Sequence, residues 1–178
     1  MDKVLNYKDE ITRMMEALSH NPRTVFIGQT VKYPGSVMSE TLKDVPDNKK
    51  IEFPVAEELQ MGVGIGMALA SDTVPILIYP RIDFLLCAIN QLSNHLDVMK
   101  ELTHGEFHPK VIIRTIIGAT KPLYPGIQHC RDLTDVFKTL LKNVMVLELD
   151  KAEKVMPVYN LSFIVPKSVL IIERAELY

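Results

Sequence analysis

A carboxylate followed by regularly spaced glycines is the part of this sequence best suited to chemistry. Glu57 comes directly after a short apolar stretch, and Gly62 and Gly66 follow it one helical turn apart. Ligands of parallel sheets bind at the carboxyl ends of the strands, where a carboxylate can hold or transfer a proton. A simpler role for Glu57 is to complement the positive end of a helix dipole. Position alone leaves both interpretations open.

The glycines do not form a nucleotide-binding fingerprint. After Gly62 and Gly64, a dinucleotide motif requires its third glycine at position 67, where the chain has Met67. Spacing by one helical turn would instead let two helices approach closely. The sequence also contains no GxSxG, GxxxxGK or HExxH motif, so common hydrolase, nucleotide-binding and metalloprotease functions lack support.

His129 is the histidine best suited to a site, because it follows a loop rich in glycine and proline. The alternative is an ordinary loop histidine. His104 and His108 have the i, i+4 spacing of a metal pair, but Gly105 and Pro109 argue against a helix that would hold them on one face. We therefore expect no metal ligands in this chain.

These residues must be positioned by alternating strands and helices. Solidly apolar runs predict strands at 24–28, 51–55, 74–79, 111–116, 144–149 and 168–172. Helical patterns predict a first helix after Asn6, a short one near 39–42, and longer ones at 84–102 and 133–141. The residues of 57–69 are small or apolar almost all round, which predicts a helix buried on every side. This alternation predicts a three-layer α/β domain, with a mostly parallel sheet and helices on both faces. No repeat or linker appears, so residues 1–178 are expected to form a single domain.

The composition is that of a soluble globular protein. Of the 178 residues, 47% are hydrophobic and 24% charged, and the net charge of -2 offers no attraction for nucleic acid or anionic lipid. The longest uncharged apolar stretch, 61–70, is too short to span a bilayer, and the charged start lacks the apolar run of a signal peptide. The two cysteines form no CxxC pair. We therefore expect a cytoplasmic protein with no nucleic-acid or membrane partner.

The joint pattern Glu57-x4-Gly62-Val63-x2-Gly66-Met67 resembles the E-x4-G-Φ-x2-G-Φ motif of thiamine-diphosphate enzymes, Φ being apolar. It is specific because the acid, the glycines and the apolar positions must all coincide. Further likeness to the beta subunits of 2-oxoacid dehydrogenases lies in segments 53–57, 83–91, 111–115, 126–129 and 168–173. From about residue 22 onward, the sequence thus resembles the pyrimidine-binding domain of the transketolase and 2-oxoacid dehydrogenase beta-subunit family.

The resemblance implies a role for each site residue. Glu57 would hydrogen-bond the aminopyrimidine ring of thiamine diphosphate and favour its imino tautomer. Phe84 would stack on that ring, although a core phenylalanine is the competing interpretation, and Gln91 would also contact the cofactor. His129 would handle the substrate or an acyl intermediate. Gly62 and Gly66 would lie in an interface between chains, where helices 57–69 and 84–102 are expected to bury surface.

Two departures from the family shape the expected assembly. The sequence has no GDG-type motif, so Mg²⁺ and the cofactor's diphosphate would be held by a partner chain, in a heterotetramer. It also stops at Tyr178, where similar subunits continue, so the diphosphate-binding and carboxyl-terminal transketolase-like domains are expected to be absent. A third departure concerns the loop 118–126, where residues 119–125 replace the run of glycines usual in the family.

The expected function is therefore one subunit of a split enzyme, inactive alone, that acts on a 2-oxo acid or ketose. In isolation, the chain is expected to pair with itself through the surface meant for its partner. The competing hypothesis is a non-catalytic scaffold or regulatory protein that keeps the fold and the interface. The joint presence of Glu57, Phe84 and His129 favours catalysis, because a scaffold needs only the packing residues.

Overall fold

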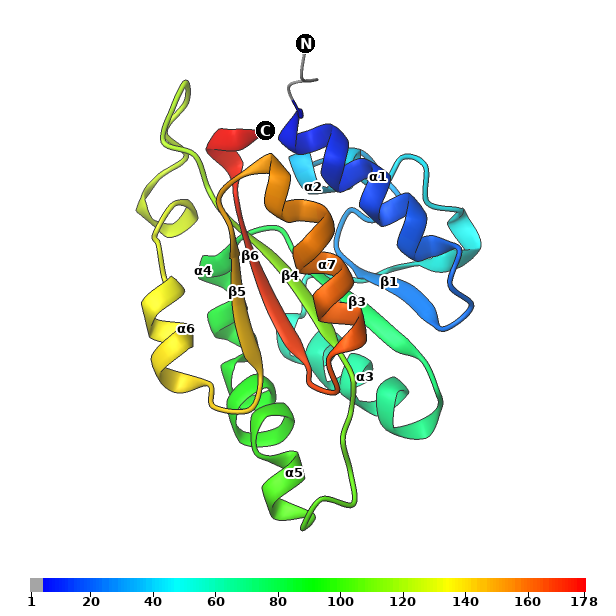
Figure 1. Cartoon of the computed structure of the whole chain (residues 1–178). Helices are drawn as coiled ribbons and strands as arrows, with labels where there is room; N and C mark the ends of the chain where they lie inside the picture. Colours follow the sequence, from blue (N-terminus) through cyan, green and yellow to red (C-terminus); the bar gives the residue numbers. More distant parts are fainter. Residues whose placement is uncertain (1–4) are drawn as a thin grey trace.

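Six parallel strands form the central layer of the computed structural model, which describes residues 5–178 (Figure 1). Their order across the sheet is β2-β1-β3-β4-β6-β5. The strands are β1 (Thr24–Gly28), β2 (Lys50–Glu52), β3 (Val74–Tyr79), β4 (Ile112–Ile117), β5 (Met145–Leu149) and β6 (Val169–Arg174). Every neighbouring pair is parallel, so the predicted parallel sheet is confirmed.

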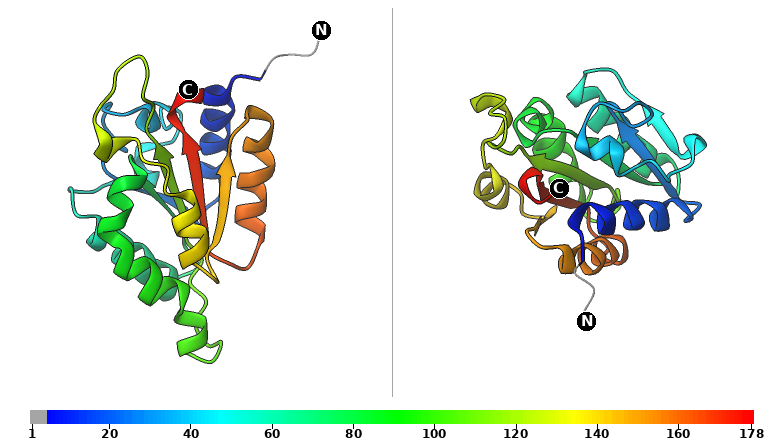
Figure 2. Two further views of the ribbon diagram at one scale, coloured as in Figure 1. Left: turned by 90° about the vertical axis from the view of Figure 1, so that its left-hand side faces the viewer. Right: turned by 90° about the horizontal axis from the view of Figure 1, so that it is seen from above.

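Helices cover both faces of this sheet, as Figure 2 shows. One face carries α1 (Tyr7–Ser19), α2 (Val37–Glu40) and α7 (Val155–Ile164). The other carries α3 (Glu57–Ala70), α4 (Ile82–Leu85), α5 (Met99–Leu102) and α6 (Thr134–Leu140). Strand β3 serves both cores, because Ile76 and Ile78 pack on the first side and Leu77 and Tyr79 on the second. Burial on both faces explains why the strands are continuously apolar.

The first helix is confirmed where the sequence predicted it. Its start is capped by Asn6, whose side chain accepts a hydrogen bond of 3.0 Å from the backbone nitrogen of Asp9. The residues spaced for one helical face, namely Ile11, Met14, Met15 and Leu18, are all buried. None of the helices among the described residues is long and apolar enough to cross a membrane.

The helical pattern predicted over residues 84–102 is confirmed, but the segment is not one regular α-helix. It is divided into α4, a 3-10 turn η2 (Leu86–Ala88), a π-helical segment η3 (Gln91–Asp97) and α5. One local and one long-range interaction accompany the change. Ser93 donates its hydroxyl to the carbonyl of Ile89 at 2.7 Å, and buried Asp97 accepts backbone hydrogen bonds from 142–144. Apolar periodicity cannot reveal such long-range ties.

Two other boundaries differ from the sequence predictions. Strand β2 ends at Glu52 rather than reaching position 55, because Pro54 has no backbone N–H to donate. Helix α7 was not predicted at all. It has no charged residue, so no charged face marks it in the sequence. Pro157 argues against a helix interior, but it lies in the first turn, where proline is tolerated. The short helices α2 and α6 lie within two residues of their predicted places.

A buried ion pair ties the middle of the sheet together. Arg114 of β4 donates to Glu173 of β6 at 2.6 and 3.1 Å, and both side chains are fully buried. Tyr159 of α7 donates to the same carboxylate at 2.5 Å, and Tyr178 donates to its other oxygen. The carboxylate of Glu173 therefore joins two strands, a helix and the last residue of the chain.

We expect the substitution Arg114→Met to destabilise the protein by about 3–5 kcal/mol, because it leaves the charge of Glu173 buried without its partner. Urea unfolding measures the loss. Arg13→Met is the matched control, since Arg13 is largely exposed and its pair with Glu10 should contribute less than about 1 kcal/mol. A similar loss in both variants would contradict this account.

Alkaline pH should unfold the protein through its buried tyrosines. Burial raises the pKa of Tyr7, Tyr79, Tyr159 and Tyr178 above the ordinary value of 10.0. The folded state therefore keeps these protons to higher pH than the unfolded state, so stability is lost as the pH rises above about 10. Urea unfolding at increasing pH, followed together with phenolate absorbance, tests this. Ionisation of these four phenols in a protein that stays folded would refute it.

Candidate functional site

The sheet reverses its strand order at β1, whose neighbours β2 and β3 both follow it in the chain. In sheets of this kind, ligands bind outside the carboxyl ends of the strands at such a switch point. Here the two strand ends are unusually close. A Cβ atom added to Gly28 at the end of β1 would lie 2.5 Å from the carbonyl oxygen of Ile78 in β3, so only glycine permits this approach.

Glu57 lies above these two strand ends as the first residue of α3. Its Oε1 accepts a hydrogen bond of 3.2 Å from the amide of Gln29, the residue directly after β1. Its backbone carbonyl accepts one of 3.0 Å from the hydroxyl of Tyr79, the last residue of β3. Strands β1 and β3 therefore both hold Glu57, whose charge also suits the positive end of the helix dipole.

Tyr79 and Cys87, whose pKa values are raised by burial and by the charge of Glu57, remain protonated at neutral pH. Burial, followed by the negative charges of Glu57 and Glu58, raises the pKa of Tyr79. The same causes raise the pKa of the Cys87 thiol, although this residue is largely exposed. A thiol whose pKa is raised is a poor nucleophile. Cys87 therefore offers the site a small neutral side chain rather than a reactive thiolate.

Phe84 and His129 meet directly. Their ring centroids lie 5.3 Å apart in an edge-to-face arrangement, with 76° between the ring planes. Phe84 belongs to α4 and is 36% exposed, while His129 ends the short helical turn η4 (Ile127–His129). The His129 backbone rests on the end of β4, because a Cβ atom added to Gly118 would lie 1.9 Å from its carbonyl oxygen.

Gln91 is less clearly part of this cluster. It begins the π-helical segment η3, and its side-chain oxygen is buried without a hydrogen-bond partner. Among the described residues, no hydrogen bond joins Gln91 to Glu57, Phe84 or His129. Irregular helical turns of this kind are frequent at functional sites. A role for Gln91 in cofactor binding stays a prediction.

Helix α3 has an open apolar face beside the site. Nothing lies within 4 Å of a Cβ atom added to Gly62 or Gly66, and Leu59 and Val63 are 53% and 37% exposed. The prediction that this helix is buried on every side is therefore wrong for the single chain. Its inner face, which includes Gln60 and Met61, is the buried one. A role of Gly62 and Gly66 in an interface stays a prediction.

Two residues at the site were missed in the sequence. Gln29 directly follows the carboxyl end of β1, and Arg81 lies two residues after the carboxyl end of β3. The signal was present, because the same rule that drew attention to Glu57 applies to any polar residue just after a strand. What the sequence could not show is that Gln29 reaches the carboxylate of Glu57.

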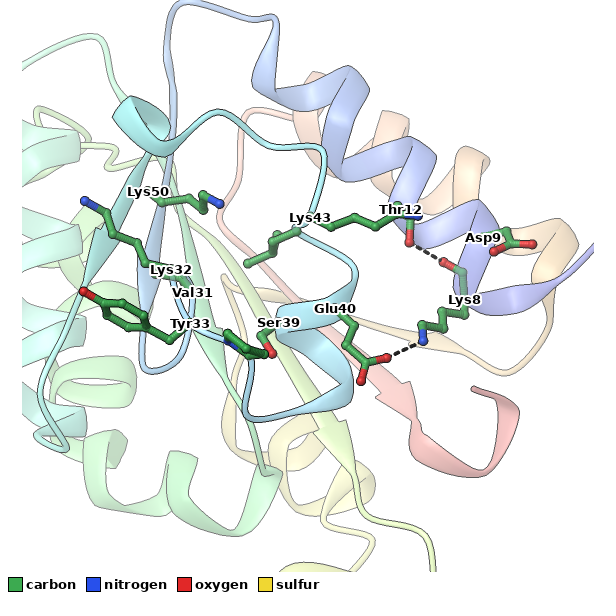
Figure 3. A pocket seen from close by; sticks show the side chains of 12 residues that line it. Lys8, Asp9, Thr12, Val31, Lys32, Tyr33, Ser39, Glu40, Lys43 and Lys50 are labelled. Carbon is green, nitrogen blue, oxygen red and sulfur yellow. Dashed lines mark hydrogen bonds and ion pairs between the residues drawn. The ribbon is translucent and has the colours of Figure 1, made fainter.

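A separate cavity of about 560 Å³ lies between α1, α2 and the loop after β1 (Figure 3). Four lysines line it, but three of them have acidic partners: Lys8 pairs with Glu40, Lys50 with Asp47 at 2.9 Å, and Lys43 with Asp44 at 4.0 Å. None of Glu57, Phe84, Gln91 and His129 lines this cavity. It is therefore distinct from the candidate site.

Within residues 5–178, no group of three or more histidine, cysteine, aspartate or glutamate side chains could hold a metal ion. The pair His104 and His108 lies in a turn rather than on a helix. His104 and Gly105 adopt positive φ angles of 51° and 89°, which reverse the chain there.

Comparison with known proteins identifies the relationship. No family model matches the chain. It is 26% identical over 167 residues to the pyruvate dehydrogenase E1 component subunit beta of Cyanidium caldarium, covering 92% of this chain and 50% of that protein. It is 30% identical over 145 residues to the same subunit of Gracilaria tenuistipitata var. liui, covering 79% and 43%. The chain is thus related in sequence to the beta subunits of the transketolase and 2-oxoacid dehydrogenase family.

Solved structures of transketolases share the fold of this chain. A split-gene transketolase described as an inactive beta4 tetramer superposes with a TM-score of 0.72 at 15% identity, over 97% of this chain and 52% of that one. Transketolase from Campylobacter jejuni subsp. jejuni NCTC 11168 gives 0.76 at 13% identity, over 96% and 26%. The chain thus spans about half the length, or less, of the family members it matches.

Two glycine substitutions should have opposite effects on stability, because Gly118 contacts the His129 backbone and Gly66 lies on the open face of α3. Gly118→Ala should destabilise the chain by about 1–3 kcal/mol, because the added methyl group would displace the His129 backbone. Gly66→Ala should stabilise the isolated chain by about 0.5–1 kcal/mol, because alanine favours helix and meets nothing there. Urea unfolding compares the two. Equal effects would show that the His129 loop does not rest on Gly118.

Proposed function

We propose that the chain is the pyrimidine-binding subunit of a split thiamine-diphosphate enzyme, in which Glu57 activates the cofactor for attack on a 2-oxo acid or ketose. The observation that carries this proposal is the grouping of Glu57 and the Phe84–His129 pair at the carboxyl ends of neighbouring strands. Sequence similarity to pyruvate dehydrogenase E1 beta subunits supports it.

The side chains suit an aminopyrimidine ring. Gln29 engages only Oε1 of Glu57, and Oε2 has no hydrogen-bond partner among the described residues. A carboxyl group of this kind can exchange a proton with a ring nitrogen. The partly exposed ring of Phe84 offers a flat apolar surface on which a second ring can stack. The two requirements of the ring, a proton partner and a stacking surface, are therefore both met.

Each residue then has a defined task. When bound, thiamine diphosphate supplies a carbon nucleophile for a carbonyl substrate. Glu57 holds or returns the proton at the pyrimidine nitrogen, and Gln29 fixes the orientation of its carboxylate. Phe84 orients the ring, while His129 donates a hydrogen bond or a proton to the substrate oxygen. Tyr79 keeps the start of α3 in place through the carbonyl of Glu57.

The proposed enzyme needs a second chain. This sequence contains no GDG-type motif, so a partner would hold the diphosphate and Mg²⁺, as part of a heterotetramer. The open face of α3, with Leu59, Gly62, Val63 and Gly66, is the surface that such a partner would cover. The inactive beta4 tetramer of a split-gene transketolase supports self-association of the isolated chain. In this proposal, the described chain is a single pyrimidine-binding domain.

The test is a pair of substitutions on adjacent residues. In a complex reconstituted with a GDG-containing partner, Glu57→Gln should lower the thiamine-dependent rate by about 10²- to 10⁴-fold, because an amide cannot exchange the proton. Glu58→Gln is the matched control. It removes the same charge from the same helix end, which is worth only about 0.3–1 kcal/mol of stability, and should leave the rate nearly unchanged.

The result separates the competing functions. Equal rates for Glu57→Gln and the wild-type complex would reject the catalytic assignment of Glu57. A chain that assembles with its partner but binds no thiamine diphosphate, measured by calorimetry, would instead support the scaffold hypothesis.

A further inference from the structure

Arg81 differs from every other arginine in the chain. Five of the six arginines form ion pairs with carboxylates: Arg13, Arg23, Arg114, Arg131 and Arg174. Arg81 forms none with any carboxylate of residues 5–178, although it is half-buried. A partly buried charge without a partner costs free energy, so such groups are commonly kept for function.

Most of the hydrogen-bonding capacity of Arg81 is unused. Its Nη1 donates to the carbonyl of Pro80 at 2.7 Å, and its Nε is buried with no partner. Its Nη2 makes no hydrogen bond within residues 5–178, yet it is not among the buried unpaired atoms, so it reaches the surface. A guanidinium group carries five N–H donors in a planar fork. Arg81 therefore presents an uncommitted cation to solvent.

The position of Arg81 is central to the candidate site. It follows β3 and caps the start of α4, where its carbonyl accepts a hydrogen bond of 3.2 Å from the backbone nitrogen of Phe84. Its Nε lies 3.4 Å from the Cβ position of Gly118, the residue against which the His129 backbone rests. Arg81 is thus next to the Phe84–His129 pair, and Glu57 lies over the same end of β3 through Tyr79.

The nearby acidic groups do not neutralise Arg81. Asp83, two residues further along, is paired with Arg131 at 2.6 Å. Glu57 is hydrogen-bonded to Gln29. Since neither carboxylate forms an ion pair with Arg81, an anion from outside the chain is the partner that this site lacks.

We propose that Arg81 binds the carboxylate of the substrate and so makes this site specific for 2-oxo acids over neutral ketoses. This inference rests on the function proposed above. The guanidinium fork matches a carboxylate in two hydrogen bonds. In a 2-oxo acid, the carboxylate is bonded directly to the reacting carbonyl carbon. Holding it at Arg81 brings that carbonyl next to His129. A ketose has no charge at this position, so it gains nothing from Arg81.

The first experiment uses the full chain alone. We expect the NMR signal of the Arg81 Nε–H to shift saturably on titration with pyruvate, and not with neutral hydroxyacetone. The shift should be absent in Arg81→Gln and kept in Arg23→Gln, whose arginine pairs with Asp72 at 2.7 Å. Urea unfolding verifies that each variant is folded. The proposal would be overturned if pyruvate caused no shift, or if hydroxyacetone caused the same shift. It would also be overturned if the shift remained in Arg81→Gln.

The second experiment uses the reconstituted complex. Arg81→Gln should raise the KM for pyruvate by about 10- to 100-fold, the value of a lost hydrogen bond to a charged group, with a smaller change in kcat. Arg81→Lys should recover part of the loss. An unchanged KM together with weaker assembly would mean that a carboxylate of the partner chain occupies Arg81, and would overturn the proposal. Failure of the proposed function can be distinguished from failure of the Arg81 proposal. In that case Glu57→Gln would leave turnover intact while pyruvate still shifts the Arg81 signal.

Discussion

The site depends on the hydrogen bonds that attach helix α3 to strands β1 and β3. Gln60 is fully buried, and its amide donates to the carbonyls of Ile27 and Ile78 at 3.3 and 3.1 Å. These two strands can lie this close only because Gly28 has no side chain. Gln60 is one turn beyond Glu57, so the same fastening fixes the start of the helix. The carboxylate is therefore positioned by rigid elements rather than by a loop, which suits a proton-transfer group.

Stability and chemistry occupy different parts of the sheet. The Arg114–Glu173 pair is buried in the middle and linked to α7 and the chain end, so its charges are satisfied within the chain. Arg81, just beyond the carboxyl end of the inner strand β3, has no carboxylate partner within residues 5–178. A buried arginine in an ion pair holds elements together, whereas a surface-reaching arginine without a carboxylate partner retains binding capacity. The contrast between Arg114 and Arg81 explains why only the second is assigned to a ligand.

Features that depend on interactions between residues close in the sequence could be predicted, whereas those that depend on residues far apart in the sequence could not. The strands and α1 depend on local apolar runs and on the Asn6 cap, which the sequence displays directly. The π-helical segment depends partly on Asp97 binding the backbone near position 143, and α7 has no polar face to reveal it. For the site, the place of Glu57 followed from the strand-end rule. The pairing of Arg131 with Asp83, which leaves Arg81 free, required the folded chain.

Helix α3 couples the proposed catalysis to assembly. Its first residue is the candidate proton-transfer group, while Gly62 and Gly66 lie on its open face within the next three turns. Desolvation strengthens the hydrogen bond of a carboxyl group to a ring nitrogen, and in the single chain Glu57 is only partly buried. A chain that covers Leu59 and Val63 would also exclude water from Glu57. Under the proposed function, the same contact that completes the interface would thus make its carboxyl group effective, and an unassembled subunit would do no chemistry.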